Sequence, residues 1–553
     1  MLHLARRVPP FSLPARPIRF LATGSTRPLS RTTTRRVRLV SGGVIGGSLL
    51  VGYGFSAVYA DVAPPARTRE HERSPVPLIK LIRSYVVYTM CSVPALVDYS
   101  PSILEFLTSI PGIKQITEAF VRVTFFGHFV GGDTAQACVP LLRELRTENK
   151  GALLAYSVEV DEHEAAGKER KIREPVHKRI VQEMLRSIDV AADFEDQYAP
   201  AAGASAGRRT WVAIKLSALL PDAEALRHFS AHLLQFPPYH SPSVPFPGSP
   251  QRTDLDVLAS GKTAHGSPLM PQDLVDLKDL YADLRRICMR AKERNVRVII
   301  DAEYTWYQPA IDSLSLALMR EFNALPEPSW WSFKRPALPP LVYVTFQAYL
   351  RRTPEYLLRS LQDAQSGNYA LGIKLVRGAY HEQEALVHPH PPALSPAPHP
   401  PVWATKPETD RCYDASARAL VLALRTTPAH VGVLFGTHNR SSCGVILDEL
   451  VRQGLARREI EGDAEVVRVR EDVAERATIA QLYGMSDALT NHLVETTRSS
   501  APFVIKYVPY GALSEVMPYL SRRAIENKSV LGNGQAAEER KQVWAQIRKR
   551  LLG

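Results

Sequence analysis

The sequence predicts an α/β fold organised as an eight-stranded (βα)8 barrel. After Asn149, short apolar runs each precede a helical segment, which is the rhythm of parallel strands joined by crossover helices. The first strand–helix turn carries no glycine-rich dinucleotide fingerprint, so a closed barrel is favoured over an open doubly wound sheet. Nearly every run also ends in a charged or amide residue. The predicted strands are Leu153–Val160, Trp211–Leu219, Arg297–Tyr304, Leu341–Tyr349, Leu371–Tyr380, Val431–Asn439, Thr478–Gly484 and Phe503–Tyr510.

The first sixty residues differ in composition from the rest of the chain. They contain nine arginines, no lysine and no acidic residue, so 12 − 9 leaves a net charge of only +3 on the other residues. A nearly neutral body argues against nucleic-acid binding. An arginine-, serine- and threonine-rich start without acids is typical of a mitochondrial transit segment, with a basic tail as the alternative. Leu39–Ala60 is uncharged and long enough either to span the inner membrane or to belong to the presequence.

The remaining regions flank or interrupt the predicted barrel, which covers residues 150–535. Residues 75–149 have a mostly helical pattern and predict an arm before the barrel, and residues 536–553 predict a C-terminal helix. Inserts at 235–272, 326–340 and 386–404 are rich in proline, histidine or serine, which predicts partly disordered loops. Prolines separate the histidines of the last insert, so no metal site is expected. The five scattered cysteines predict reduced thiols in an intracellular compartment.

Polar side chains fall at the ends of the predicted strands, where barrel active sites are built. Each one alone could be a paired residue of the barrel wall. Together they predict a single site, because buried charges need partners or a ligand. In chain order these residues are Glu159, Lys215, Ser217, Asp301, Glu303, Gln347, Lys374, Arg377, Thr437, His438, Asn439, Gln481, Tyr483, Lys506, Tyr507 and Tyr510.

The last predicted strand leads through a glycine turn into a helical segment, Ala512–Asn527. At 100° per residue, one stripe of this helix carries Tyr519, Arg522, Arg523 and Glu526. Adjacent arginines are either a solvated pair or a clamp for a carboxylate, since guanidinium forks bind that group bidentately. The excess of cations predicts an anionic cofactor with a small anionic substrate. The alternatives are a metal- or pyridoxal-dependent barrel enzyme and a membrane-tethered scaffold.

A set of short segments, in this order, resembles the proline dehydrogenase family over roughly residues 150–535. The arginine-rich start resembles the mitochondrial, fungal-type members of that family. The segments are Ile214–Leu219, Ile300–Glu303, Gln347–Tyr349, Gly372–Tyr380, Thr405–Asp410, Gly436–Asn439, Gln481–Met485 and Tyr519–Asn527. The resemblance implies a distorted (βα)8 barrel that binds FAD without a Rossmann domain and oxidises L-proline to Δ1-pyrroline-5-carboxylate. It also implies a quinone as electron acceptor and a place at the matrix side of the mitochondrial inner membrane.

The resemblance also implies roles for individual residues. The expected substrate residues are Lys215, Arg522 and Arg523 at the carboxylate, Tyr507 and Tyr519 against the ring, Tyr380 closing the site and Glu159 at its gate. The expected cofactor residues are Asp301, Gln347, Lys374, Val376, Gly378, Thr405, Lys406, Thr437, His438 and Gln481. Glu526 would either orient the arginines or contact the cofactor. Hydroxyproline dehydrogenases share most of these segments, but the bulky phenol of Tyr507 leaves little room for a ring hydroxyl and favours proline.

Overall fold

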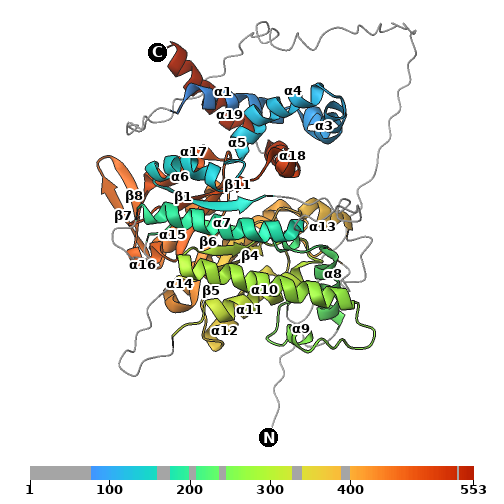
Figure 1. Cartoon of the computed structure of the whole chain (residues 1–553). Coiled ribbons are helices and arrows are strands. Elements are labelled where there is room, and N and C mark those ends of the chain that lie inside the picture. Colours follow the sequence, from blue (N-terminus) through green and yellow to red (C-terminus); the bar gives the residue numbers. More distant parts are fainter. Residues whose placement is uncertain are drawn as a thin grey trace, which may run out of the picture. The chain divides into compact units, whose positions relative to one another are not determined.

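Eight parallel strands close into a barrel in the computed structural model of the chain (Figure 1). The neighbours around the barrel follow the order β1-β11-β9-β6-β5-β4-β3-β2. All eight predicted strands are confirmed, as is the closed barrel. Their observed bounds are β1 Lys150–Tyr156, β2 Thr210–Ile214, β3 Val298–Ile300, β4 Val342–Gln347, β5 Leu371–Val376, β6 Val431–Gly436, β9 Ala477–Leu482 and β11 Val504–Tyr510.

The structure describes residues 76–157, 175–198, 207–235, 244–326, 339–387, 399–531 and 535–552. The chain divides into two units, residues 1–73 and 74–553, and every described residue belongs to the second unit. The predicted gate residue Glu159 and the apolar segment Leu39–Ala60 lie outside the described residues, as does the predicted transit segment. Within the described ranges, no helix is long and apolar enough to cross a membrane.

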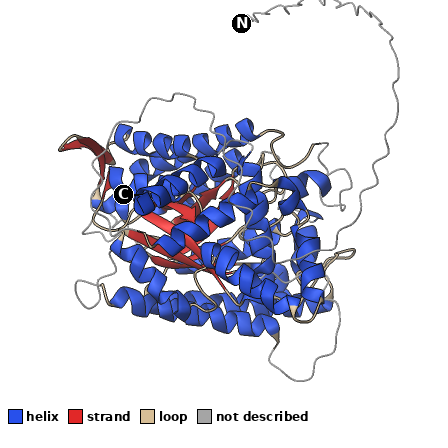
Figure 2. Cartoon of the chain, turned by 90° about the horizontal axis from the view of Figure 1, so that it is seen from above, coloured by secondary structure: helices blue, strands red, loops and turns tan. Residues whose placement is uncertain are grey.

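Helices cover the outer face of the barrel, and Figure 2 shows them surrounding the strands. Their apolar faces pack against the outward-facing residues of the strands in one continuous core. The surrounding helices are α7 Val176–Asp196, α8 Glu224–Gln235, α10 Pro271–Arg294, α11 Gln308–Phe322, α12 Thr353–Ser366, α14 Lys406–Thr426, α15 Arg440–Arg452 and α17 Asp487–Thr496.

The alternation of side chains along each strand decides which residues enter the barrel. Trp211, Ile299 and Ile505 belong to a separate cluster that fills the barrel interior. Successive strand residues point to opposite faces, so residues two or four positions further on also point inward. Asp301 and Tyr507 follow Ile299 and Ile505 by two positions. The strand period therefore directs these polar side chains into the carboxyl end of the barrel.

The helix after the last strand, α18 (Leu513–Leu531), packs with the helical arm. Its residues Leu513, Val516 and Leu520 share a buried cluster with Val87 and Phe129 of the arm. The arm and the C-terminal helix comprise α1 Leu78–Cys91, α2 Pro94–Asp98, α3 Ser100–Ser109, α4 Ile113–Val121, a π-helical turn Arg122–Phe126, α5 Gly127–Phe129, α6 Val139–Thr147 and α19 Gln535–Leu552.

Two parts of the chain differ from the sequence-based expectation. A small sheet of β7 (Ala456–Glu461), β8 (Ala464–Val469) and β10 (Thr497–Arg498) was not predicted, because β7 alternates charged residues without an apolar face. The expectation that residues 235–272 form a loop holds for most of the described part of that range, and it is wrong for two short helical stretches. Its described part contains α9 (Asp256–Ser260), and α10 starts at Pro271. The buried Arg352 guanidinium ties this insert to the barrel by donating to the Gly248 carbonyl at 2.7 Å.

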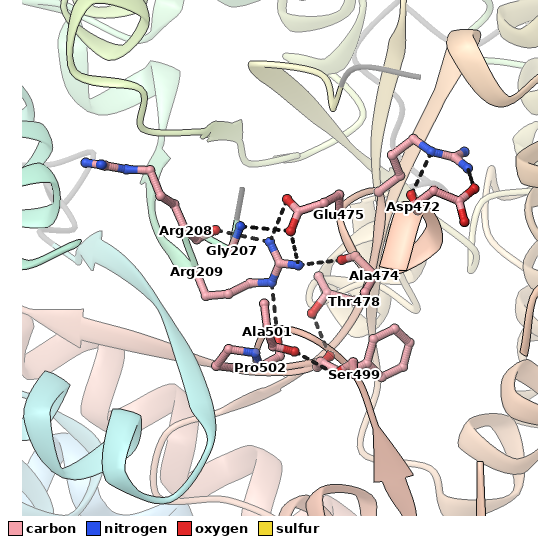
Figure 3. A network of polar contacts seen from close by, with 12 residues as sticks. Gly207, Arg208, Arg209, Asp472, Ala474, Glu475, Thr478, Ser499, Ala501 and Pro502 are labelled. Atoms are coloured by element: carbon pink, nitrogen blue, oxygen red, sulfur yellow. Dashed lines mark hydrogen bonds and ion pairs between the residues drawn. The ribbon is translucent and has the colours of Figure 1, made fainter. Parts of the chain in front are cut away.

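A buried polar network closes the amino-terminal end of the barrel (Figure 3). Arg209, which precedes β2, is fully buried and donates to the carbonyls of Pro502 at 3.0 Å and Ala474 at 2.5 Å. Its guanidinium lies 3.4 Å from a carboxylate oxygen of Glu475, and Arg297 reaches the other oxygen at 3.2 Å. Burial alone would raise the pKa of Glu475, but Arg209 and Arg297 reverse this and hold its pKa below the ordinary value.

Candidate active site

Asp301, Lys374 and Tyr507 meet at the carboxyl end of the barrel, although they come from three different strands. Lys374 forms an ion pair with one carboxylate oxygen of Asp301, and the Tyr507 hydroxyl donates to the other at 2.9 Å. The Lys374 ammonium lies 5.3 Å from the centroid of the Tyr507 ring. Burial and the Asp301 charge raise the pKa of Tyr507 well above its ordinary value, so its phenol stays neutral. The three side chains form a rigid polar floor inside the barrel.

A second group of polar side chains lies beside this floor. Glu303 accepts from the Ser217 backbone N–H at 2.9 Å and from the Ser217 hydroxyl, and it lies 4.0 Å from the Lys215 ammonium. The sequence marked Glu303 only as a strand-end residue. The structure shows that it is the carboxylate that faces Lys215.

The side-chain amide of Gln347 uses its nitrogen for hydrogen bonds within the described residues but not its oxygen. Its Nε2 donates to the Glu303 carbonyl at 3.2 Å and to the Tyr349 hydroxyl at 3.0 Å. Its Oε1 is buried and has no hydrogen-bond partner among the described residues. Leaving a buried acceptor unsatisfied costs on the order of 1–3 kcal/mol, and such groups in native proteins call for an explanation. A ligand that presents an N–H donor would supply one.

Helix α18 places its arginine stripe toward aromatic rings. The Arg522 guanidinium lies 5.7 Å from the Tyr380 ring centroid, and that of Arg523 lies 4.9 Å from the ring of Tyr519. Arg523 also donates to Glu526 at 2.6 Å. Tyr519 and Arg523 are each only 4% exposed, which excludes a solvated stripe. This contact is the one that orientation of an arginine by Glu526 requires, and both expected roles of Glu526 stay predictions.

An aromatic wall that the sequence did not single out supports Tyr380. The Tyr380 ring lies 4.3 Å from that of Tyr304, which stacks on Trp306 at 4.3 Å and 8°. Glu384 anchors the loop that carries this wall, because it accepts from the Thr305 backbone N–H at 2.7 Å and from its hydroxyl at 2.6 Å. The run Tyr304–Tyr307, directly after the third strand, was the available signal.

Thr437 and His438, at the end of β6, lie in a separate branch of the polar network. The His438 Nδ1 pairs with the Ser486 hydroxyl at 2.8 Å. Burial, together with the charges of Lys506, Arg523 and Arg377, lowers the pKa of His438 to about 3, so its ring is neutral at physiological pH. Gln481 donates to the Thr437 carbonyl at 3.2 Å. These residues offer neutral hydrogen-bonding groups near buried cations.

Arg377 links this branch to the predicted residues Thr405 and Lys406. Its guanidinium donates to Asp410 at 2.7 Å, to the Thr437 hydroxyl at 2.7 Å and to Ser442 at 2.8 Å. Lys406 pairs with Asp410 at 2.6 Å, whereas Thr405 forms the N-terminal capping box of α14 with Glu408. Both Thr405 and Lys406 are exposed. They lie at the outer end of a chain of contacts that reaches the barrel mouth through Arg377.

Gly378, just after β5, occupies a backbone position that only glycine tolerates. Its φ is +126°, and an added Cβ would lie 1.4 Å from the ring of Tyr349. The chain therefore passes directly against that ring. Val376 stands at the end of β5, two positions beyond Lys374, so it shares the inward face.

The strand ends and α18 thus bring cations, aromatic rings and neutral polar groups to one end of the barrel. Six cations (Lys215, Lys374, Arg377, Lys406, Arg522 and Arg523) lie with four carboxylates (Asp301, Glu303, Asp410 and Glu526), which leaves 6 − 4 = +2. Paired guanidiniums beside aromatic rings suit a small organic carboxylate. The fold and site define a (βα)8-barrel enzyme that acts on a small organic anion.

The chain belongs to the proline dehydrogenase family, whose model matches residues 154–535, more than half of the chain. It is 28% identical to hydroxyproline dehydrogenase of Rattus norvegicus over 86% of this chain and 92% of that protein. It is also 28% identical to mitochondrial proline dehydrogenase 1 of Arabidopsis thaliana, over 87% of this chain and 85% of that protein. The resemblance seen in the motifs is thereby confirmed.

The chain shares its fold with solved structures. One of them is proline utilization A from Bdellovibrio bacteriovorus inactivated by N-propargylglycine, with a TM-score of 0.51 and 17% identity. The match covers 85% of this chain but only 38% of that protein. Family membership makes this chain an oxidoreductase of proline catabolism that acts on proline, in a family of flavoenzymes with members named mitochondrial.

Proposed function

We propose that this enzyme binds FAD at the carboxyl end of the barrel and oxidises L-proline to Δ1-pyrroline-5-carboxylate under α18. The observation that carries the proposal is the polar floor of Asp301, Lys374 and Tyr507, with the open Gln347 acceptor beside it and the arginines of α18 in the same site. This arrangement has one region for a flavin ring and another for a carboxylate.

The residues present fit FAD. The unpartnered Gln347 Oε1 suits an N–H edge of the isoalloxazine, and the buried Lys374 favours negative charge on that ring system. FAD, when bound, supplies the two-electron acceptor. Neutral His438 and Thr437 would hold its ribityl and phosphate portions, with the half-buried Arg377 as a counter-charge. The remaining cofactor contacts fall to Asp301, Val376, Gly378, Gln481, Thr405 and Lys406.

Proline binds by its carboxylate in this proposal. Arg522, Arg523 and Lys215 hold that group, and Tyr507 and Tyr519 pack against the ring. Tyr380 and the aromatic wall close the site, with Glu159 as the gate. The proline nitrogen must be neutral for its lone pair to assist departure of the hydride, and nearby cations favour the deprotonated amine. Holding the proline ring at contact distance from the hydride acceptor contributes strongly to the rate, because the reacting atoms are already in place.

Hydroxyproline is the alternative substrate, because relatives named hydroxyproline dehydrogenase match over 86% of this chain. The Tyr507 hydroxyl bonded to Asp301 at 2.9 Å fixes a phenol in the substrate region and leaves little space for a ring hydroxyl. We therefore expect kcat/KM to be higher for L-proline than for trans-4-hydroxy-L-proline. The opposite order would assign the enzyme to hydroxyproline.

The decisive experiment is an anaerobic titration of the purified, yellow holoenzyme with L-proline. The flavin absorption should bleach, and Arg522→Met should weaken proline binding by about a hundredfold while the bound flavin spectrum persists, because only a charge-assisted carboxylate contact is removed. Arg425→Met is the matched control, since Arg425 is an exposed arginine in the last turn of α14. Loss of FAD in Arg522→Met would show that the clamp is misassigned.

A quinone acceptor and contact with the matrix face of the inner membrane complete the proposal. The arm exposes large apolar side chains that soluble surfaces rarely gather, among them Tyr99, Phe106 and Ile116 at 66%, 65% and 71% exposure. Helix α19 ends in Arg548, Lys549 and Arg550 followed by exposed Leu551 and Leu552, a composition suited to an anionic lipid surface.

Membrane contact can be tested at a single position, because all five native cysteines are buried. Phe106→Cys labelled with an environment-sensitive fluorophore should brighten and shift to the blue on addition of anionic phosphatidylglycerol vesicles. Ile460→Cys, at an equally exposed aliphatic position in β7, should not respond. An unchanged signal at position 106 would contradict docking through the arm.

A further inference from the structure

The insert between α8 and α10 forms a cavity with α11 and α12 that the proposed reaction does not use. Its described segment runs from residue 244 through α9 and lies over two adjoining cavities of about 250 and 580 Å³. Both cavities are lined by Gln251, Arg252 and Leu316. The insert is held in place by the Arg352–Gly248 hydrogen bond and by the Ser313 hydroxyl, which donates to Asp254 at 2.6 Å. This is a built site on the flank of the barrel.

The lining presents hydrogen-bond donors that nothing in the described chain accepts. The hydroxyl of Ser249, a residue only 1% exposed, is buried without a partner, and so is Gln251 Nε2. The Nε of Arg320, which lines the larger cavity, is in the same state. Gln251 Nε2 and Arg320 Nε can only donate, and the Ser249 hydroxyl can donate as well as accept. Because buried polar groups in native proteins are normally paired, an acceptor-rich ligand is indicated.

The charged residues of the lining indicate whether the ligand is an anion or a cation. Arg359 lines the smaller cavity and is half-buried, and no ion pair of its guanidinium occurs among the described residues. The carboxylate there, Asp363, already accepts from Arg320 at 2.6 Å and from the Tyr369 hydroxyl at 2.9 Å, and it lies 3.6 Å from Arg252. Lys278 lines the larger cavity. Asp256 also lines the larger cavity, so the two linings together hold four cations (Arg252, Lys278, Arg320 and Arg359) and two acids (Asp256 and Asp363). This excess of cations favours an anion over a cation.

The floor of the smaller cavity is apolar and aromatic. Phe346 and Tyr356 stack with centroids 4.6 Å apart and an interplanar angle of 10°, beside Met319 and Leu371. Phe346 belongs to the outer core of the barrel, whereas Gln347, the next residue of β4, takes the opposite face of the strand. The cavity is therefore separated from the candidate active site by the barrel wall.

We propose that this insert forms a second binding site, for an organic anion whose apolar body packs beside Phe346, Met319 and Leu371. The carboxylate or phosphate head is held by Ser249, Gln251 and Arg359, with Arg252 at the rim. Acceptor oxygens on the head satisfy the open donors, and its charge neutralises Arg359. The site gives the insert a function that its proline-rich composition concealed.

The test is calorimetric titration of the holoenzyme with benzoate, with phenyl phosphate as the phosphate-headed probe and benzyl alcohol as the neutral isostere. Benzoate or phenyl phosphate should bind, benzyl alcohol should not, and Arg359→Met should weaken binding by about tenfold or more through loss of a charge-assisted contact. Arg425→Met is the matched exposed-arginine control and should have no effect. Equal binding of benzoate and benzyl alcohol would overturn the anion assignment.

Benzoate could also occupy the proposed proline clamp, so the Arg522→Met variant separates the two locations. Binding that survives in Arg522→Met and weakens in Arg359→Met supports the second site, whereas binding lost only in Arg522→Met overturns it. A second variant covers the case in which Arg359→Met fails to fold. Ser249→Ala removes an unpartnered hydroxyl, so it should weaken binding severalfold without lowering the thermal midpoint of the free enzyme. Unchanged affinity in Ser249→Ala would overturn the proposal.

Discussion

The two ends of the barrel carry charged side chains of the same kinds but use them differently. At the amino-terminal end, Arg209 is fully buried and its guanidinium nitrogens contact carbonyls and the Glu475 carboxylate (Figure 3). At the carboxyl end, Lys215 and Asp301 keep side-chain exposures of 29% and 21%, and the Gln347 acceptor is open among the described residues. The Arg209 guanidinium is satisfied without a ligand, whereas the Gln347 acceptor is not.

The difference follows from what each end must do. Buried charges that satisfy one another fix the geometry of the closed barrel, and the satisfied guanidinium leaves no donor for a ligand to contact. At the carboxyl end, a ligand that pairs with the open acceptors, cations and aromatic rings gains binding free energy from these contacts. The same contrast predicts that mutations at the amino-terminal end change stability, whereas those at the carboxyl end change catalysis.

The largest effect is expected for Glu475→Gln. The substitution keeps the shape of the side chain but leaves the buried guanidiniums of Arg209 and Arg297 without their counter-charge, which should destabilise the fold by about 3–5 kcal/mol. The thermal midpoint should fall by several degrees, with kcat/KM for proline unchanged in the folded fraction.

Glu461→Gln is the matched control for this experiment. Glu461 pairs with Arg468 and Arg498 on the exposed hairpin sheet, where an ion pair contributes less than about 1 kcal/mol. Equal destabilisation by the two variants would contradict the proposed difference between the barrel ends. It would mean that the buried Arg209 network contributes no more to stability than an exposed ion pair.

A smaller effect is expected for Tyr507→Phe, and it should fall on activity instead of stability. The variant removes the hydroxyl that donates to Asp301 at 2.9 Å but leaves the ion pair of Asp301 with Lys374. We expect kcat/KM for L-proline to fall about tenfold, since one hydrogen bond to a charged group is lost, with little change in thermal midpoint. Steady-state kinetics and a thermal melt measure the two quantities.

Tyr510→Phe tests whether position in the barrel is the cause. Tyr510 lies on the same strand but belongs to the outer core, where its ring packs 5.3 Å from that of Tyr156. Its loss of a hydroxyl should leave kcat/KM unchanged. Comparable loss of activity in both variants would place the effect in the strand as a whole and not at the carboxyl end.

The sequence predicted the eight strands and the place of Asp301, Lys374 and Tyr507 at strand ends, because both follow from local rules. The contacts among these three side chains were not predicted. Apolar runs mark strands, and parallel strands bring their carboxyl ends together. The Arg209–Glu475 network was not predicted, because its members precede strands separated by hundreds of residues and none carries a motif. The aromatic wall of Tyr304 and Trp306 also depends on a tertiary contact with Tyr380.

Regions without an apolar period were predicted least well. The hairpin of β7 and β8 is held by pairs such as Arg468–Glu459, which look like a solvated charge run in one dimension. The insert before α10 is held by hydrogen bonds of Arg352 and Asp254, and no local sequence pattern predicts such long-range contacts. The roles of Glu159 and of Leu39–Ala60 stay predictions, as do those of Thr405 and Lys406 at the exposed start of α14.

The smallest expected effect is a pH dependence that separates the two ends. The folded pKa of His438 is about 3, below the unfolded value of about 6.5, so the unfolded chain binds more protons in that window. Stability is therefore full above pH 6.5 and falls as the pH drops toward 3. The folded pKa of Glu475 lies below the ordinary value of 4.5, so protonation of Glu475 lowers stability only at more acidic pH.

Between pH 7 and pH 6, the parent enzyme should therefore lose more stability than His438→Gln, by less than about 1 kcal/mol. Glu475→Gln should show the same pH dependence as the parent enzyme, starting from a lower stability. Thermal melts of the three proteins at the two pH values measure this, and identical slopes in the parent and His438→Gln would contradict a neutral His438.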